Sequence, residues 1–309
     1  MRILVLGAGG IGGYYGARIH RAGGDVTFLV RPTRAAQLKE NGLVVSSPFG
    51  DLHVRPKVVT KDTLPAPFDV VILSCKAYDL NSAMDAIAPA LGEQSVILPL
   101  LNGVRHIDTL IARFGAARVL GGVALISVVL APNGEVKHLN KLHRLFTGSL
   151  TPQSSKWLAE LALLLASSGI EFALSENIEQ AMWDKIVFLS TLAGATCTMR
   201  ASIGDVLRTA AGEEFITGLL AECAKTAAAC GHAVSDTQLA AYGKQLTEAG
   251  SGLMASMLRD IERGGATEAD HILGDLVGRA QTKGVATPLL RLAYSHLQAY
   301  DVRRQAATN

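Results

Sequence analysis

The amino-acid sequence predicts an α/β protein with a doubly wound parallel sheet in its N-terminal half and an all-α C-terminal half. Three observations predict this plan. The chain has 309 residues, which is long for a single compact domain. Short apolar runs alternate with stretches of helical period over the first half, the pattern of a parallel sheet covered by helices. After about residue 172 helical periodicity alone continues, so we expect domains at residues 1–172 and 173–309.

The expected parallel strands are short and continuously apolar, as is typical of strands covered on both faces. They lie at Arg2–Leu6, Asp25–Val30, Val70–Cys75, Val96–Leu98 and Val119–Leu125, with helices at Ile11–Ala22, Thr33–Asn41, Asn81–Leu91 and His106–Phe114 and a final helix and strand at Trp157–Ala166 and Ile170–Ala173. Two further pairs of runs, 43–56 and 126–139, each contain a turn with proline and glycine. These pairs predict antiparallel hairpins.

The second half predicts about six helices whose ends are marked by local signals. Asn177 can cap the first of them. Gly231 and Gly284 are expected to follow helix C-termini, where glycine adopts the left-handed conformation. Thr287-Pro288 is a capping residue followed by proline at the first helical position, so a last helix should begin there.

The composition excludes several classes of protein. Hydrophobic residues make up 49% of the chain and charged residues 18%, so the chain can build sizeable cores and is not disordered. The net charge of +2 comes from scattered basic residues and aromatic residues make up only 5%, which argues against a nucleic-acid or membrane partner. The N-terminal apolar run is too glycine-rich for a signal peptide, and no run reaches the roughly 18 apolar residues that span a bilayer.

The cysteines indicate a reducing compartment and no metal site. Cys75, Cys197, Cys223 and Cys230 form no CxxC pair, and no histidine stands at zinc-ligand spacing beside them. We expect all four to be small buried side chains of a cytoplasmic protein.

A glycine-rich turn follows the first strand and opens the first helix. Its residues are Gly7, Ala8, Gly9, Gly10, Ile11 and Gly12. In the GxGxxG pattern the first glycine makes the tight turn, the second lets the backbone approach a pyrophosphate, and the third lets helix and strand pack closely. The helix N-terminus adds unpaired N–H donors and a positive dipole end. The turn therefore predicts a dinucleotide site in a domain of the Rossmann type.

The end of the second strand favours NADP over NAD. NAD enzymes place an acidic residue there to accept hydrogen bonds from the adenosine ribose. Here Val30 is followed by Arg31, Arg34 lies close by, and no carboxylate is expected within reach. A guanidinium is a bidentate partner for a 2′-phosphate, so NADP (NADPH) is the predicted cofactor. A solvated loop arginine is the alternative reading of Arg31.

Five motifs, in order along the chain, give this sequence a resemblance to a known family. They are MRILVLGAGGIGGYYG at the start with Arg31 after the second strand, LSCKAYD around Lys76, PLLNGV with Asn102-Gly103, MWDKIVFL around Lys185, and SMLRDIERGGATEADHILGDLV followed by GVATPLL. From Met1 to about Gln298 the sequence resembles the ketopantoate reductase (2-dehydropantoate 2-reductase) family. The resemblance implies a Rossmann domain joined to a helical domain, and an enzyme of pantothenate biosynthesis or a paralogue of it.

The resemblance also implies a role for individual residues. Lys185 would donate a proton to the substrate carbonyl oxygen, and Glu268 would lie near the substrate hydroxyl and hold the lysine network in place. Asn102 and Ser256 would hydrogen-bond the substrate, and Asn102 and Lys76 would contact the cofactor. Because these residues belong to both expected domains, the resemblance implies a reaction between them.

The residues taken alone leave other readings open. Lys185 lies in a nearly apolar segment, where a lysine either extends to water or is held with the lowered pKa that a general acid needs. Glu268 follows Thr267 and could serve only as the acidic first turn of a capped helix. Ser256 could be an ordinary surface hydroxyl, and Asn102-Gly103 a plain turn.

Two other groups of polar residues are expected to be structural. The run KHLNKLHR, which contains His138 and His143, predicts a solvated hairpin and loop. The pair Glu213-Glu214 predicts the acidic first turn of a helix, not a pair of catalytic carboxylates.

The sequence departs from the family pattern where the substrate would be recognised. Positions at which the family carries asparagines hold Leu189, Ala193, Ile203 and Leu253. A small polar oxo acid loses affinity when its hydrogen-bond partners are replaced by apolar groups. We therefore expect a paralogue that reduces a different, more apolar 2-oxo acid or ketone.

The sequence is compatible with three functions. The first is NADPH-dependent reduction of a 2-oxo acid to a 2-hydroxy acid, with ketopantoate or a related compound as substrate. The second is a 3-hydroxyacid or opine-type dehydrogenase, whose signatures the sequence lacks. The third is a redox-sensing NADP-binding protein without turnover, which the retention of Lys185 and Glu268 argues against. The apolar faces of the helical half leave a homodimer open.

Overall fold

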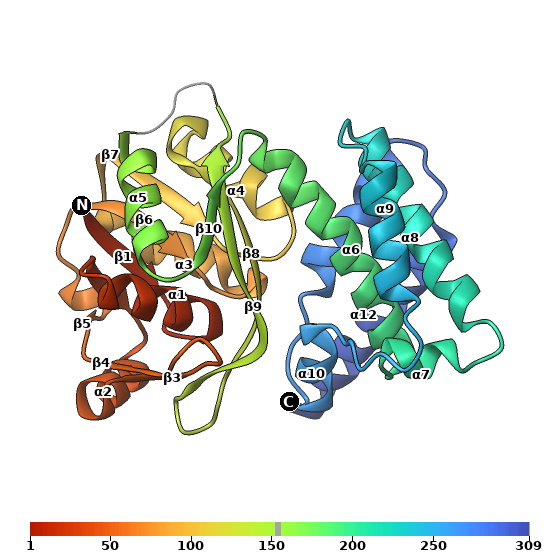
Figure 1. Ribbon diagram of the computed structural model, residues 1–309, viewed down its shortest axis with the longest axis horizontal. Coiled ribbons are helices and arrows are strands. Elements are labelled where there is room, and N and C mark those ends of the chain that lie inside the picture. Colours follow the sequence, from red (N-terminus) through yellow and green to blue (C-terminus); the bar gives the residue numbers. More distant parts are fainter. Residues whose placement is uncertain (152–155, 309) are drawn as a thin grey trace. The chain divides into compact units, whose positions relative to one another are not determined.

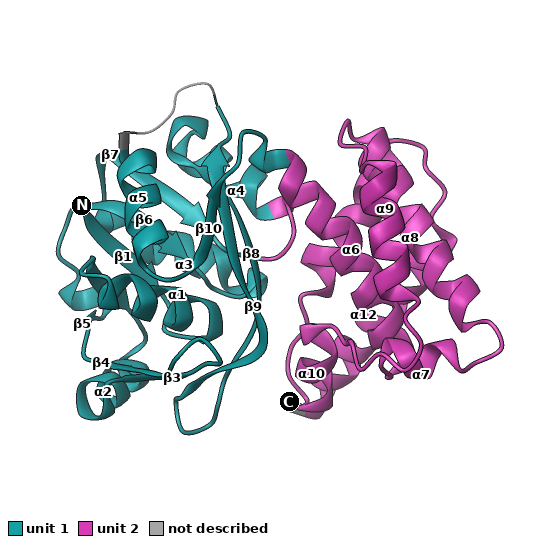
Figure 2. Ribbon diagram, in the orientation of Figure 1, with its two compact units in different colours: residues 1–101, 106–179 teal, residues 102–105, 180–309 magenta. Residues whose placement is uncertain are grey.

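The computed structural model describes residues 1–151 and 156–308, which form two compact units. Unit 1 comprises residues 1–101 and 106–179, and unit 2 comprises residues 102–105 and 180–309 (Figure 2). The short segment Asn102–Arg105 thus belongs to unit 2 by its contacts, although unit 1 precedes and follows it in the sequence. The second division falls inside the helix α6 (Ile178–Met199), whereas the sequence suggested a border near residue 172.

Unit 1 contains the predicted parallel sheet. Its strands, in spatial order, are β5 (Lys57–Val59), β2 (Asp25–Leu29), β1 (Arg2–Leu6), β6 (Phe68–Leu73) and β7 (Leu91–Pro99), and every neighbouring pair is parallel. The accompanying helices are α1 (Gly10–Arg21), α2 (Pro32–Asn41), α3 (Leu80–Ile87) and α4 (Arg105–Phe114) (Figure 1). Ile3 and Val5 enter one core and Leu4 enters another, so both faces of β1 are covered. This explains the continuous apolar run and confirms the doubly wound sheet.

A second sheet completes unit 1. Its order is β10 (Glu171–Leu174), β9 (Val136–Ser149), β3 (Leu43–Ser46) and β4 (Leu52–Val54), with β8 (Leu120–Leu130) also paired to β9. The helix α5 (Lys156–Ser167) precedes β10 (Figure 1). Leu43 pairs with Val54 and Leu130 with Val136, both in antiparallel register, so both predicted hairpins are confirmed.

The expectation of a parallel strand at Val119–Leu125 was wrong. Only Val119 forms a parallel bridge, to Ile97, and the strand that follows is antiparallel to β9 over almost its whole length. The physical reason is the turn at 131–134, which returns the chain directly onto β8 and gives it a neighbouring partner.

The expectation that His138 and His143 are solvated was also wrong. Their side chains are only 7% and 6% exposed, because α1 and the turn between β3 and β4 cover this part of β9. The Tyr14 hydroxyl and His143 Nδ1 are 2.9 Å apart, and the Phe49 ring stacks on His143 with centroids 3.6 Å apart. His138 Nδ1 lies 2.9 Å from the Ser47 hydroxyl. The two imidazoles thus form a buried polar layer in unit 1.

Acid should destabilise the protein through His143. Its pKa lies below the ordinary value of 6.5 because burial disfavours the imidazolium; Arg18 and His138 act in the same sense and Glu171 opposes them. The unfolded chain therefore binds this proton more readily, so stability is full above the ordinary pKa and is lost as the pH falls through it. We expect the urea midpoint to drop between about pH 8 and about pH 5, and to drop less in His143→Gln. The exposed His53→Gln variant is the control; equal slopes for His143→Gln and wild type would refute the expectation.

Unit 2 is helical, as predicted. Besides most of α6 it contains α7 (Ile203–Leu207), α8 (Gly212–Ala229), α9 (Asp236–Leu246), α10 (Ser256–Glu262), a π-helical turn (Asp270–Gly274), α11 (Asp275–Thr282) and α12 (Pro288–Thr308) (Figure 1). Gly231 and Gly284 follow α8 and α11 in the left-handed conformation, and α12 begins at Pro288, so the predicted boundaries are confirmed. Glu213 and Glu214 lie in the first turn of α8, also as predicted.

A buried carboxylate holds α8 and α12 together. Glu222 is 9% exposed, and its two carboxylate oxygens accept hydrogen bonds from the amides of Leu289 (3.0 Å) and Leu290 (2.8 Å). These amides belong to the first turn of α12, where donors lack partners within the helix and the dipole favours an anion. Glu222 is therefore a structural group, although sequence reasoning did not single it out.

Two of the four cysteines are buried and two are partly exposed. Cys197 and Cys223 are buried as expected, but Cys75 and Cys230 are partly exposed. Within residues 1–151 and 156–308 we find no helix with the length and apolar character needed to cross a membrane. In the same described ranges no three His, Cys, Asp or Glu side chains gather as a metal site would require.

Candidate active site

Three residues predicted to bind the cofactor follow neighbouring parallel strands of unit 1. Gly7 comes after β1, Arg31 after β2 and Lys76 after β6. Since β1 lies between β2 and β6 and all three run parallel, these residues lie at one edge of the sheet. The chain continues from β1 to β2 on one side and reaches β6 on the other side of β1. Open α/β sheets bind their ligands at such a point, where the strand order reverses.

The geometry of the glycine-rich turn fits a dinucleotide pyrophosphate. Gly7 has φ +91°, a conformation that a side chain would strain. A Cβ on Gly12 would lie 2.2 Å from the Ser74 hydroxyl and 2.3 Å from the Gly7 carbonyl oxygen, so helix and strand approach as closely as a glycine allows. A Cβ on Gly9 would meet nothing within 4 Å, which leaves room beside this backbone for a phosphate. The helix α1 begins at Gly10 and presents its N-terminus to that space.

Arg31 has an acidic neighbour that the sequence did not reveal. Its guanidinium Nη2 lies 3.2 Å from Oδ1 of Asp79, which follows β6 in a 3₁₀ turn (Ala77–Asp79). The expectation that no carboxylate reaches this end of the sheet was therefore wrong. The acid was overlooked because it is 48 residues away along the chain and only the strand order makes it a neighbour.

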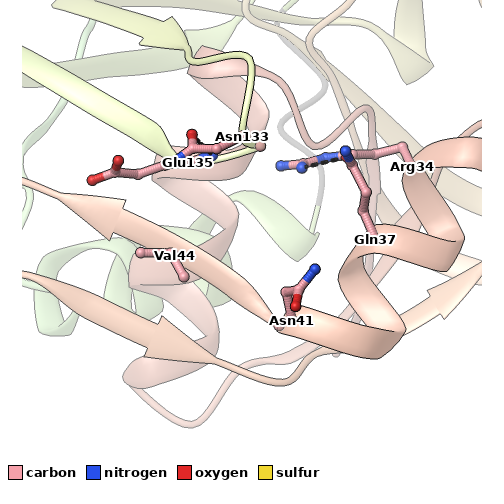
Figure 3. Close-up of a pocket in the computed structure, with 8 residues that line it drawn as sticks. Arg34, Gln37, Asn41, Val44, Asn133 and Glu135 are labelled. Carbon is pink, nitrogen blue, oxygen red and sulfur yellow. Dashed lines mark hydrogen bonds between the residues drawn. The ribbon is translucent and has the colours of Figure 1, made fainter.

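Arg34 supports the glycine-rich turn from α2. Its Nη2 and Nε donate to the Ala8 carbonyl oxygen at 2.9 and 3.2 Å, and its Nη1 donates to Gln37 Oε1 at 3.1 Å. Burial lowers the pKa of this guanidinium. Arg34 also borders a polar cavity of about 290 Å³, in which it points toward the turn that carries Asn133 (Figure 3). The cavity is lined by Arg34, Gln37, Asn41, Gly42, Val44, Asn133, Gly134 and Glu135.

Unit 2 brings together Lys185, Asn102 and Glu268, three residues predicted to act at the catalytic site. The Lys185 ammonium donates a hydrogen bond to the Asn102 side-chain oxygen over 3.0 Å. Burial lowers the pKa of Lys185 to about 8, while the nearby negative charge of Glu268 acts in the opposite sense. A lysine with such a pKa remains mostly protonated near neutrality and can give up its proton readily, as a general acid must.

Glu268 is held at the start of the π-helical turn. Its side chain is 6% exposed, and its backbone carbonyl accepts hydrogen bonds from the amides of His271 (3.1 Å) and Ile272 (3.0 Å). The preceding Thr267 hydroxyl accepts from the Ala269 amide and donates to the Asp301 carboxylate. Such single π turns widen a helix locally and are frequent at functional sites. Glu268 is therefore a buried acid on an ordered backbone, not a solvated acid of an ordinary first turn.

His271 is a further residue of this group that sequence reasoning missed. It is 8% exposed, its ring hydrogen-bonds the Asn102 backbone, and its pKa is lowered by burial. Gly103 has φ +93°, and a Cβ there would lie 2.8 Å from the His271 ring. The imidazole therefore packs directly against the Asn102-Gly103 turn. The sequence does contain one indication of this role: His271 is three residues after Glu268, and residues at this spacing lie next to each other on a helix.

Ser256 is the other residue, besides Asn102, that is expected to hydrogen-bond the substrate. Ser256 is exposed at the first residue of α10, and the amide before it, of Ala255, donates to the Thr196 hydroxyl of α6 over 3.3 Å.

Four apolar side chains occupy the positions where the family resemblance implies asparagines. Leu189 and Ala193 lie four and eight residues after Lys185 on α6, which places them on the same helix face as the lysine. The Ile203 amide donates to the Leu253 carbonyl over 3.0 Å, so a backbone hydrogen bond brings these two residues side by side. Ala193 and Ile203 are buried, whereas Leu189 and Leu253 are partly exposed.

Family models match most of the chain. The model of ketopantoate reductase PanE/ApbA matches residues 3–151, and that of its C-terminal domain matches residues 177–301. A protein of Bacillus subtilis described as the uncharacterized oxidoreductase YkpB is 35% identical over 304 residues, which is 98% of this chain and 100% of that protein.

Two solved structures illustrate the shared fold. The 2-dehydropantoate 2-reductase from Geobacter metallireducens GS-15 is 27% identical, with a TM-score of 0.88 over 97% of this chain and 99% of that one. A D-mandelate dehydrogenase solved with NADH and anilino(oxo)acetate is 22% identical, with a TM-score of 0.89 over 99% of this chain and 100% of that one. With two family models matched along most of its length, the chain belongs to the ketopantoate reductase family of nicotinamide-dinucleotide-dependent oxidoreductases.

Proposed function

We propose that the protein is an NADPH-dependent reductase that converts a 2-oxo acid into the corresponding 2-hydroxy acid. The observation that carries this proposal is the partly buried Lys185 ammonium, with its pKa of about 8, hydrogen-bonded to Asn102 and accompanied by Glu268. An ammonium kept in such surroundings is suited to proton donation in the interior of a protein.

Reduction of a ketone adds a hydride to the carbonyl carbon and a proton to the oxygen. Bound NADPH would supply the hydride. Lys185 would donate its Nζ proton to the oxygen as negative charge develops there, and the neutral amine would recover a proton from water. Asn102 would orient the ammonium, and Glu268 would keep it protonated through its negative charge. Ser256 would hydrogen-bond the substrate.

The cofactor would be held by residues at the edge of the parallel sheet. The turn Gly7–Gly12 and the N-terminus of α1 would bind the pyrophosphate with backbone amides. Arg31 would bind the 2′-phosphate, and Lys76 would contact the cofactor at the same edge of the sheet. Asn102, beyond the end of β7, would contact the nicotinamide half. The isolated cysteines of the sequence support a cytoplasmic location for the reaction.

The substrate is proposed to be more apolar than ketopantoate. Leu189, Ala193, Ile203 and Leu253 offer no side-chain hydrogen-bond partner to additional hydroxyl groups of a substrate at these positions. Sites that hydrogen-bond a substrate hydroxyl discriminate strongly, whereas apolar sites select by shape and surface. A 2-oxo acid with a branched aliphatic or aromatic substituent suits such a site better than a hydroxylated one.

A substrate panel tests this proposal. NADPH oxidation would be followed by absorbance with ketopantoate and with 2-oxo acids carrying aliphatic or aromatic substituents. We expect kcat/KM for the best apolar acid to exceed that for ketopantoate by about tenfold or more. The Leu189→Asn variant should narrow this ratio, and the matched change Leu292→Asn, on an exposed position of α12, should not. NADPH binding without oxidation of any acid would overturn the proposed function.

A further inference from the structure

The ion pair between Arg31 and Asp79 lies where the adenosine end of the cofactor is expected. The two residues follow β2 and β6, the strands on either side of β1, so the pair spans the edge at which the glycine-rich turn begins. The side chain of Arg31 is 80% exposed and that of Asp79 is 37% exposed. Both charges are therefore accessible to a ligand in solution.

Local hydrogen bonds hold the backbone of Asp79 in place at this edge of the sheet. Its amide donates to the Lys76 carbonyl over 2.9 Å, which closes the 3₁₀ turn. Its carbonyl accepts from the Ser82 hydroxyl over 2.9 Å, which ties it to the first turn of α3. Lys76 and Asp79 thus stand at the two ends of one short turn, and the carboxylate is the acidic member of a group that also contains two cations.

We propose that Asp79 is a specificity-determining residue that reduces the preference of this site for a 2′-phosphate. It would thereby allow NADH to act as hydride donor in addition to NADPH. This inference rests on the proposed function only in requiring that a nicotinamide dinucleotide binds at this edge. A 2′-phosphate that approaches Arg31 meets the carboxylate that already neutralises it, and two anions a few ångströms apart repel each other. A ribose 2′-hydroxyl, in contrast, can donate a hydrogen bond to the same carboxylate, as in NAD-dependent enzymes.

The pair can be altered without disturbing the fold. Exposed ion pairs contribute little to stability, so neutralising Asp79 should leave the protein folded. The isosteric Asp79→Asn removes the negative charge and keeps the size of the side chain. Asp85→Asn is a matched control, because Asp85 lies on α3, just after the turn of Asp79, is exposed and pairs with an arginine, Arg113, at 2.7 Å.

The test is a direct measurement of binding by the full-length protein. Dissociation constants for NADPH and NADH would be obtained from nicotinamide fluorescence, with adenosine 2′,5′-bisphosphate and adenosine 5′-monophosphate as competing fragments. We expect Asp79→Asn to shift the NADPH-to-NADH affinity ratio toward NADPH by about tenfold, and the shift to shrink as salt is raised. Asp85→Asn should leave the ratio unchanged, and Arg31→Ala should move it toward NADH.

Each outcome bears on a different claim. If Asp79→Asn changes the NADPH-to-NADH affinity ratio by less than about twofold, the role of Asp79 is overturned while the proposed reductase stands. The same holds if Asp85→Asn changes the ratio as much as Asp79→Asn does. A wild-type protein that binds neither dinucleotide overturns the proposed function together with this inference. A wild-type protein that prefers NADPH over NADH by about a thousandfold would also contradict the role of Asp79, since its carboxylate would then not weaken binding of the 2′-phosphate.

Discussion

Lys185→Ala is expected to lower kcat for 2-oxo acid reduction by about a thousandfold while the dissociation constant of NADPH stays within about twofold of wild type. The variant removes the proton donor from the carbonyl oxygen but leaves the glycine-rich turn and Arg31 of unit 1 intact. Stopped-flow or steady-state rates with the preferred 2-oxo acid, together with a fluorescence titration of NADPH, would check both parts. Lys225→Ala, an exposed lysine on α8, is the control.

The pH profile gives this prediction a second readout that a mere loss of structure would not produce. The pKa of Lys185 is lowered to about 8, so the ammonium is the major form below that pH and the neutral amine above it. The rate of reduction should therefore fall as the pH rises through about 8, and oxidation of the hydroxy acid should increase over the same range. A kcat for reduction that does not change between about pH 7 and about pH 9, or a Lys185→Ala enzyme of wild-type rate, would remove the lysine from the mechanism.

Gly12→Ala is expected to abolish measurable dinucleotide binding, a loss of at least about a hundredfold, and to lower the free energy of unfolding by about 1–3 kcal/mol. The added Cβ would meet the Gly7 carbonyl oxygen at 2.3 Å, and that oxygen is backbone of the turn itself. It would also meet the Ser74 hydroxyl, which donates to the Leu6 carbonyl over 2.8 Å. The turn and the start of α1 must separate to admit it, which moves the amides expected to bind the pyrophosphate.

Two glycine variants separate the effect on binding from the effect on folding. Gly9→Ala meets no atom within 4 Å, so it should fold normally and yet weaken dinucleotide binding if a phosphate approaches this backbone. Gly243→Ala lies within α9, also in open space, and should stabilise that helix slightly without any effect on binding. Urea denaturation and NADPH titration of the three variants would check these expectations. Wild-type affinity in Gly12→Ala would contradict the assignment of the turn.

The parts of the fold that the sequence predicted depend on local pattern. The strand Arg2–Leu6, the two hairpins and the start of α12 at Pro288 follow from apolar runs, turn residues and a cap within a few positions. The errors have two causes. The apolar run Leu120–Leu130 is typical of a parallel strand, but the turn at 131–134 pairs it with β9 in antiparallel register. The burial of His138 and His143 depends on α1 and a turn about ninety or more residues earlier, which no local pattern indicates.

The candidate site divides in the same way. The apolar surroundings of Lys185 are visible in its own helix, but Asn102, which accepts its hydrogen bond, is 83 residues away in the sequence. Asp79 belongs to a motif already connected with cofactor binding, yet its pairing with Arg31 requires the strand order β2-β1-β6. His271 could have been found by helical spacing from Glu268, whereas the turn it packs against could not.

The assignment of Asn102–Arg105 to unit 2 has a consequence for how such proteins can be recombined. A chimera joined within α6 would take Lys185 and Glu268 from one parent and Asn102 from the other. Lys185 and Asn102, whose side-chain oxygen accepts the hydrogen bond of the lysine, therefore come from different parents when the two halves of the chain are exchanged. A C-terminal half that is transferred between relatives should therefore carry its own residues 102–105, which belong to the same compact unit.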